Sequence, residues 1–179
     1  GASAQCEYER FLGKEDDVTL DAGFMWQEEK RIIKEVKLEA TIRLFAPLGY
    51  GAEVMQVKVV NKGEGAKSVR ITPAIPLYGR SADNIRDHRH VTSLLHRITT
   101  MPNGVCCKPV LSFDERGHQK NNMTYYVIGS DENGNDPECF FPTAESFIGE
   151  SGTFIAPEAL AEKKKGCKAG EKIDGKEAL

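Results

Sequence analysis

A two-residue alternation of apolar and polar side chains is the feature that most restricts what this chain can fold into. In the stretch VKLEATIRLF, residues 36–45, almost every second residue is apolar, and lysine, glutamate, threonine and arginine stand between them. Successive side chains of a β-strand point to opposite faces, whereas a helix would need a period near 3.6. The stretch therefore predicts a strand of an antiparallel sheet with one buried face.

The same alternation recurs along most of the chain. EVMQVKVVNKGEG (residues 53–65) ends in a glycine-rich turn, and KSVRITPAIPL (residues 67–77) contains Pro73 and Pro76, which indicate an edge strand or a bulge. Weaker strands are predicted in VTLDAGFMWQ (18–27), VTSLLHRITT (91–100), GVCCKPVLSF (104–113) and NMTYYVIGS (122–130). Many strands separated by turn signals such as MPNG and DERGHQKN predict an antiparallel β-sandwich, two sheets packed face to face.

The last part of the chain has a different pattern. PEALAEKKKG, residues 157–166, begins with a proline suited to the first helical position and ends at Gly166, so we expect one short helix there. The final residues 167–179 are polar, and we expect them to end without a strand. With 179 residues, the chain fits a single β-sandwich domain spanning 1–179, and we expect it to be a fragment of a longer multidomain enzyme.

Composition excludes several classes of partner. A formal net charge of −3 argues against a nucleic-acid partner, because proteins that bind nucleic acids usually carry an excess of basic residues. No apolar run approaches the roughly 20 residues that cross a bilayer, so no membrane partner is expected. Five cysteines without a CxxC motif favour a cytoplasmic location. Adjacent Cys106 and Cys107 would point to opposite faces of a strand, which favours ordinary packing over a redox pair.

The densest polar stretch is YGRSADNIRDHRHVTSLL, residues 78–95. His88 and His90 have the spacing of two ligands on one strand face, but Arg86 and Arg89 oppose a divalent cation. We therefore predict no metal and interpret the stretch as a charged loop, and loops presented by a rigid sandwich commonly carry binding functions.

Catalytic patterns are weak. Asp114 and Glu115 precede Arg-Gly and indicate a hairpin turn, while Glu145 and Glu150 are isolated carboxylates. No nucleophile motif or phosphate-binding loop is present. His88 or His96 with Glu145 is the only acid–base pair that the chain offers for a mutarotase-like epimerase. No catalytic residue is assigned.

Aromatic side chains offer a second kind of function. Tyr8, Phe24, Trp26 and Tyr50 have the ring types that stack on sugars in carbohydrate-binding sandwiches. In a β protein, scattered aromatic residues more often belong to the core, and we favour that interpretation. A free-standing carbohydrate-binding β-sandwich remains the alternative function.

Four segments, taken in order, resemble a known family. They are LEATIRLFAPLGYGAEVMQVKVVNKGEGAKSVRI, IPLYGRSADNIRDHRHVTSLLHRI, ESFIGESGTFIAPEAL and the final DGKEAL. Together they resemble the N-terminal module of the cellobiose/chitobiose phosphorylase family over residues 36–179. This resemblance implies a galactose-mutarotase-like supersandwich, mostly β, with one or two short helices.

The resemblance also implies a function. It makes the chain a non-catalytic module of an inverting glycoside phosphorylase that acts on β-linked disaccharides or oligosaccharides. A C-terminal catalytic barrel domain, missing from these residues, would carry the catalytic aspartate, and inorganic phosphate would serve as co-substrate without a further cofactor. The implied partners are carbohydrate, the barrel and a second copy of the chain in a homodimer.

On this analogy, six residues of the charged loop are the candidates for the substrate-site rim or the dimer interface. They are Arg80, Arg86, Asp87, His88, Arg89 and His90. Arginine suits sugar hydroxyls, phosphate and partner carboxylates because its planar fork bonds in a bidentate manner. The alternative is an internally ion-paired loop that docks the sandwich onto a linker helix.

Overall fold

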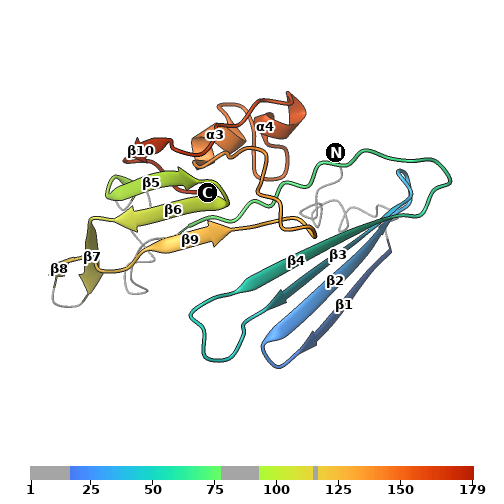
Figure 1. The fold of residues 1–179 in the computed structure, drawn as a ribbon, viewed down its shortest axis with the longest axis horizontal. Coiled ribbons are helices and arrows are strands. Elements are labelled where there is room, and N and C mark those ends of the chain that lie inside the picture. The colour runs from blue at the N-terminus through green and yellow to red at the C-terminus, as the bar shows by residue number, and fades with distance from the viewer. Residues whose placement is uncertain (1–16, 78–92, 115–116) are drawn as a thin grey trace. The chain divides into compact units, whose positions relative to one another are not determined.

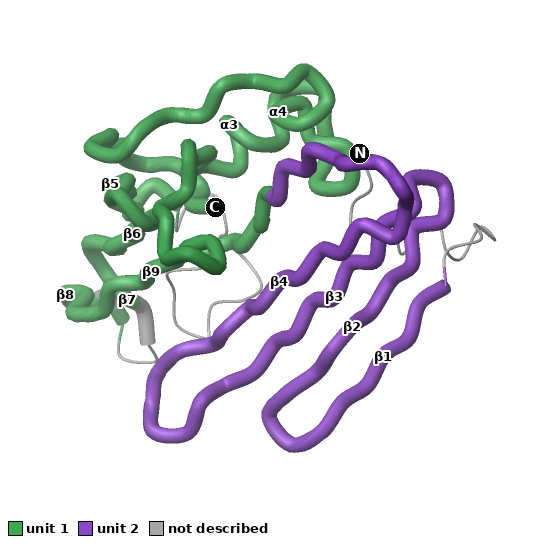
Figure 2. Tube along the Cα trace, turned by 45° about the vertical axis from the view of Figure 1, so that its right-hand side comes forward, with its two compact units in different colours: residues 1, 72–179 green, residues 2–71 purple. Residues whose placement is uncertain are grey.

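The computed structural model describes residues 17–77, 93–114 and 117–179, without the side chains of residues 113, 114 and 118. The chain divides into two compact units, residues 2–71 and residues 72–179, shown in purple and green in Figure 2. Each unit has its own sheet, and each is described by itself.

The first unit is a four-stranded antiparallel meander in which neighbours in sequence are neighbours in the sheet (Figure 1). Its strands are β1 (Asp17–Gly23), β2 (Trp26–Ile33), β3 (Leu38–Phe45) and β4 (Val54–Asn61). The predicted strands at 36–45 and 53–65 are thus confirmed as β3 and β4. The predicted strand at 18–27 is two strands, because the chain turns at Phe24 and Met25.

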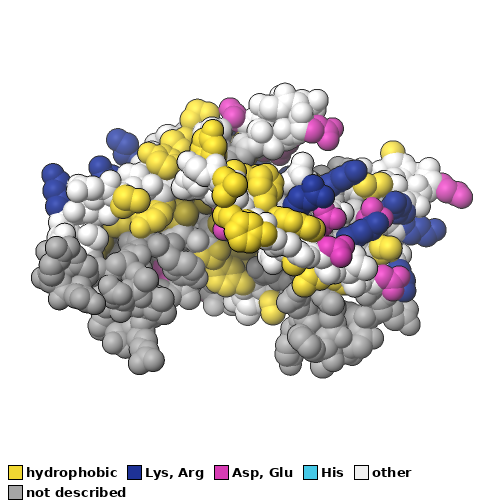
Figure 3. Space-filling view, turned by 90° about the horizontal axis from the view of Figure 1, so that it is seen from below, with side chains coloured by type: hydrophobic (Ala, Val, Ile, Leu, Met, Phe, Trp, Pro, Cys, Tyr) yellow, Lys and Arg dark blue, Asp and Glu magenta, His cyan; other side chains and the backbone are white. Residues whose placement is uncertain are grey.

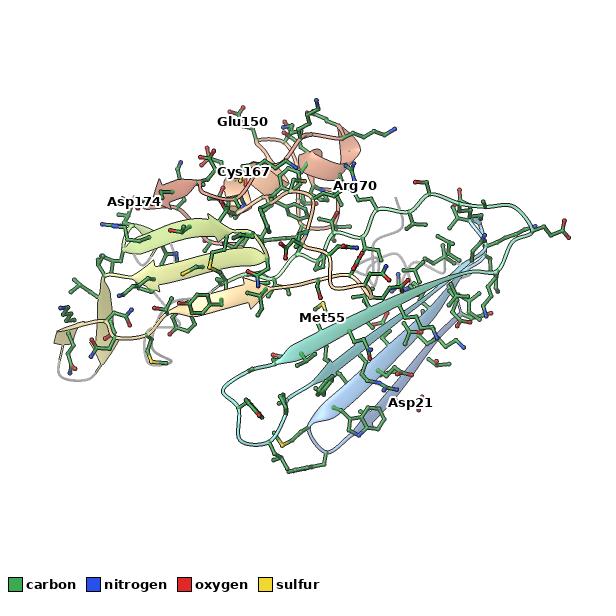
Figure 4. The ribbon with its side chains drawn as sticks, in the orientation of Figure 1. Asp21, Met55, Arg70, Glu150, Cys167 and Asp174 are labelled. Carbon is green, nitrogen blue, oxygen red and sulfur yellow. The ribbon has the colours of Figure 1, made fainter. Side chains whose placement is uncertain are left out.

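The register gives this sheet two unlike faces. One face carries the alternating apolar residues of β3 and β4, which pair directly across the strands. The opposite face, called here the charged face, carries cross-strand ion pairs: Arg43 with Glu28 at 2.7 Å, and Glu39 with Lys30 at 3.2 Å. Figure 4 shows Met55 and Asp21 projecting from opposite sides of the sheet.

Glu39 is the best-connected carboxylate of the charged face. Hydrogen bonds from Lys62 and then Lys30 hold its pKa below the ordinary value. Both lysine side chains are exposed to solvent, so such pairs chiefly fix the register of neighbouring strands.

The described residues of the second unit form a four-stranded antiparallel sheet, a hairpin and two short helices (Figure 1). The sheet has the order β10 (Lys172–Asp174), β5 (His96–Met101), β6 (Gly104–Pro109) and β9 (Tyr125–Ile128). The hairpin joins β7 (Leu111–Asp114) and β8 (Gly117–Lys120), and the helices are α3 (Ala144–Ile148) and α4 (Glu158–Ala161). The predicted strand at 104–113 is therefore two strands, β6 and β7.

Two apolar clusters form the core of this unit. The first contains Leu77, Ile98, Val105, Cys107, Phe140 and Ala178, and the second contains Phe147, Ala159 and Leu179. Within the first cluster, burial raises the pKa of the Cys107 thiol to about 12, so it stays protonated. Cys106 is less buried and lies on the other face of β6, which agrees with the packing role predicted for the pair.

Three sequence-based expectations about local structure are wrong. Residues 67–76 form no strand, because Pro73 and Pro76 have no N–H to donate. The last thirteen residues do contain a strand, β10. Its only apolar residue is Ile173, and one apolar residue cannot show the two-residue alternation by which a strand is recognised. Helix α4 is shorter than expected, and Pro157 is its N-cap rather than its first residue.

The expected fold class, mostly β with antiparallel sheets, is confirmed by these sheets, and the described residues contain the short helices α3 and α4. In the part of the chain that the structure describes, no helix is long and apolar enough to cross a membrane.

Thr100 holds the end of the chain onto β5. Its side chain is 2% exposed, and its hydroxyl donates to the Lys168 carbonyl at 2.8 Å and accepts from the Glu171 N–H at 2.9 Å. The Thr100 backbone adds bonds to Gly170 and Glu171. One buried residue thereby fixes the segment that leads into β10.

We predict that Thr100→Val destabilises the protein by about 1–3 kcal/mol, because it leaves the Lys168 carbonyl and the Glu171 N–H without their partner. The measurement is urea unfolding monitored by circular dichroism. The matched control is Thr99→Val, on the opposite face of β5. Equal stabilities for the two variants would contradict the role assigned to the Thr100 hydroxyl.

Candidate functional site

The six predicted rim or interface residues, Arg80, Arg86, Asp87, His88, Arg89 and His90, lie outside the described residues, and so does Tyr8. Nothing in the structure therefore tests them. Among the residues that the structure describes, no group of three or more His, Cys, Asp or Glu side chains is arranged to hold a metal ion.

A shallow hollow beside α3 and α4 brings together the two isolated carboxylates that the sequence singled out. It is lined by Thr143, Glu145, Ser146, Gly149, Glu150, Ser151, Glu158 and Lys164. Thr143 begins α3 with a reciprocal capping box: its hydroxyl accepts from the Ser146 N–H, and the Ser146 hydroxyl accepts from the Thr143 N–H. The cap fixes the first turn of α3, which contains Glu145.

Glu158 is the carboxylate with the most interactions in the hollow, and no sequence motif indicated it. It accepts the Ser151 N–H at 2.6 Å and Lys164 Nζ at 2.8 Å. Lys164, and to a smaller extent Ser151, holds its pKa below the usual range. Its carboxylate also occupies the space above Gly149, where a Cβ would lie 2.0 Å from Oε2. Glu158 thus joins α4 to the loop after α3.

This arrangement has the wrong electrostatics for acid catalysis of glycoside cleavage. A proton donor needs a carboxyl group whose pKa is raised, and that of Glu158 is lowered. Glu145 forms an ion pair with Lys176 at 2.5 Å. The motif FIGESG…PEA therefore encodes packing, because Phe147 and Ala159 are buried and Gly149 has a φ of 78°.

The other catalytic candidates that the structure describes are engaged in local contacts. Asp114 pairs with Gly117 across the β7–β8 hairpin, so the predicted turn is confirmed, while Glu115 lies outside the described residues. His96 is 4% exposed, and its Nδ1 lies 3.1 Å from the Lys176 carbonyl. It belongs to the packing around β10 and is not one of the residues that line the hollow with Glu145.

The preference for a core position is wrong for three of the predicted aromatic residues. Phe24 is 88% exposed, Tyr50 is 76% exposed and Trp26 is 42% exposed. Trp26 pairs with Phe45 at the end of the sheet, and the Ala46 N–H bonds to the Met25 carbonyl at 3.1 Å, which ties the β1–β2 turn to the start of the β3–β4 connection. We call Phe24, Trp26 and Tyr50 the aromatic tip.

Charged side chains lie in the next row of the sheet face that carries Trp26, where Glu28 pairs with Arg43. In the view of Figure 3, hydrophobic side chains gather in the middle of the visible face, and Lys, Arg, Asp and Glu side chains are intermixed beside them. One feature of the sequence indicated this exposure: the aromatic residues stand at or next to turns. The apolar alternation, however, did not indicate how much of each ring the rest of the protein would bury.

Antiparallel sheets and two short helices in the described residues define a mostly β module. The comparison with protein families is specific: the model of the "Glycosyl hydrolase 94, supersandwich domain" matches residues 26–176, which cover most of both units. The chain therefore belongs to this family, in agreement with the resemblance to cellobiose/chitobiose phosphorylases. No curated protein gives a significant match.

His96 supplies a pH-dependent contribution to stability. Because the Lys176 carbonyl accepts a hydrogen bond, Nδ1 carries the proton, and Nε2 is buried without a hydrogen-bond partner in the described structure. Burial lowers the pKa of His96 below its ordinary value. The unfolded chain therefore binds a proton first as the pH falls, and stability present above about pH 6.5 is lost towards the lower, folded pKa.

We predict that His96→Asn, which keeps a donor for the Lys176 carbonyl, loses less stability than the wild type between about pH 7.5 and pH 5.5. The free energy of unfolding in urea, measured across this range, provides the test. Parallel profiles for the two proteins would show that His96 does not titrate on unfolding.

Proposed function

We propose that the chain is a non-catalytic module of an inverting glycoside phosphorylase, which acts on β-linked disaccharides or oligosaccharides with inorganic phosphate as co-substrate. The observation that carries the proposal is the family match over residues 26–176. The module supports the substrate site and the assembly, and a catalytic barrel supplies the proton donor.

The chemistry of the hollow supports a non-catalytic role. An inverting phosphorylase needs one carboxylic acid to protonate the leaving group, while phosphate takes the place of the attacking water. Glu158 is held as a carboxylate by Lys164, and Glu145 is paired with Lys176. These two groups of the described chain act as structural links, so the acid is expected elsewhere in the complete enzyme.

The charged loop supplies the contact surface in this proposal. Arg80, Arg86 and Arg89 suit sugar hydroxyls, phosphate or the carboxylates of a second copy, and Asp87, His88 and His90 complement them. The sequence alone supports this part. In the enzyme that includes the barrel, Arg86→Ala combined with Arg89→Ala is expected to raise KM or to shift a dimer towards monomer, depending on which contact the loop makes.

We predict that the 179-residue chain, incubated with cellobiose or chitobiose and inorganic phosphate, releases no sugar 1-phosphate. The same chain extended by the barrel that its gene is expected to encode should release it. The assay is detection of sugar 1-phosphate by anion-exchange chromatography. Phosphorolysis by the 179-residue chain would overturn the non-catalytic assignment, and an extended protein without phosphorolysis would overturn the enzyme class.

A free-standing carbohydrate-binding sandwich is the second candidate function. The exposure of Phe24, Trp26 and Tyr50 favours it, because such rings contribute little to the core of their own sheet. The gene downstream of Leu179 distinguishes the two candidates. A stop codon directly after Leu179 would favour the second candidate, and a run of amphipathic helices would favour the first.

A further inference from the structure

We propose that the aromatic tip and the adjoining row of the charged face form a binding platform for the flat face of a β-linked oligosaccharide. The proposal rests on the proposed function for its ligand class, and it concerns residues 21–56 of the first unit alone. Four observations support it: the exposure of the rings, the way Trp26 is held, the polar row beside it and the hydrogen bond that ties the Met25 turn to Ala46.

Trp26 is held in place although it is partly exposed. A Cβ built on Gly23 would lie 2.4 Å from the Trp26 Nε1 atom and 2.8 Å from Cε2, so the indole lies directly over this glycine. Gly23 and Trp26 are opposite one another across β1 and β2. An aromatic ring that covers a cross-strand glycine stabilises the pair and fixes the ring. The ring is thus positioned before any ligand arrives, which lowers the entropic cost of binding.

The neighbouring row on the same face consists of hydrogen-bonding side chains. Two residues further along each strand, about 7 Å from the Trp26 row, stand Asp21, Glu28, Arg43 and Gln56. Arg43 bonds to Glu28 through Nε at 2.8 Å and Nη2 at 2.7 Å, and both contacts end on Oε2. The second oxygen of Glu28 and the carboxylate of Asp21 are suited to accept hydroxyl groups.

This combination fits a sugar better than a protein surface. A dry interface between proteins excludes charges from its centre, and burial of the Glu28–Arg43 pair would be costly. A pyranose has C–H groups on its flat faces, which suit the electron-rich face of an indole, and hydroxyl groups around its rim. Equatorial β-1,4 linkages keep successive rings in a flat ribbon, whereas α-1,4 linkages curl the chain.

The turn that presents the platform has a strained backbone. Met25 has a φ of 61°, in the left-handed region that glycine or asparagine usually occupies. The two-residue turn between β1 and β2 requires this conformation, and Lys37, in the turn before β3, has a similar φ of 50°. Here the Ala46 N–H bonds to the Met25 carbonyl and fixes Phe24 and Trp26 on either side of the turn.

Trp26 is the single tryptophan of the chain, so its fluorescence reports directly on the platform. We expect cellopentaose to shift the emission of the 179-residue protein to shorter wavelength in a saturable manner, and maltopentaose to bind at least about tenfold more weakly. Phe24→Ala, at an exposed position, should weaken binding of cellopentaose without unfolding the sheet. Gly23→Ala should also weaken binding of cellopentaose, because the added methyl group displaces the Trp26 indole although the tryptophan itself is still present.

The matched control is Tyr126→Ala on β9, which removes another exposed aromatic ring, 58% exposed, and should leave the titration unchanged. Circular dichroism verifies that each variant is folded, and calorimetry with Trp26→Ala should show that binding is lost. No shift with cellopentaose, or a shift that depends on protein concentration in the absence of sugar, would overturn the platform. Because the phosphorolysis assay uses the extended enzyme, failure of the platform is distinguishable from failure of the proposed function.

Discussion

The second unit depends on the pairing of the end of the chain with β5. β10 adds one edge to the sheet, Ala178 accepts the Leu77 N–H, and the Leu179 N–H bonds to the Pro142 carbonyl. Ala178 and Leu179 are then buried in the two apolar clusters of this unit. Contacts so distant in sequence carry a large loop-closure cost, so they form only when the core that they complete forms as well. The order of this unit therefore depends on residues 172–179, in which a short strand precedes two buried apolar residues.

That dependence explains where sequence reasoning succeeded and where it failed. β3 and β4 were predictable because their alternation lasts long enough to define a buried side. β10 was not predictable, since one isoleucine between charged residues gives no period, and its pairing with Ile98 comes from the tertiary fold. Residues 67–76 have the pattern of a strand, but their two prolines remove donors that a ladder requires.

In the candidate site, too, some features were predictable from the sequence and others were not. Spacing drew attention to Glu145 and Glu150, and the structure brings both to one hollow, yet the carboxylate with the most interactions there is Glu158. It is recognisable only through its partners, Ser151 and Lys164, which fold back on it. The surrounding FIGESG…PEA motif is explained by this packing: a glycine at positive φ makes room for the carboxylate that ties two helices together.

The first unit illustrates what cross-strand ion pairs contribute to a small sheet. Its charged face is fixed by ion pairs that are individually weak in water, so they specify the register more than they stabilise the sheet. An ordered row of polar side chains at the surface has a small free-energy cost, because these groups remain hydrated until a hydroxylated ligand replaces the water. Glycine at position 23 allows the Trp26 indole to lie over the strand at the end of that row. In the proposed platform, a larger residue at position 23 would displace the indole while the strand pairing is kept.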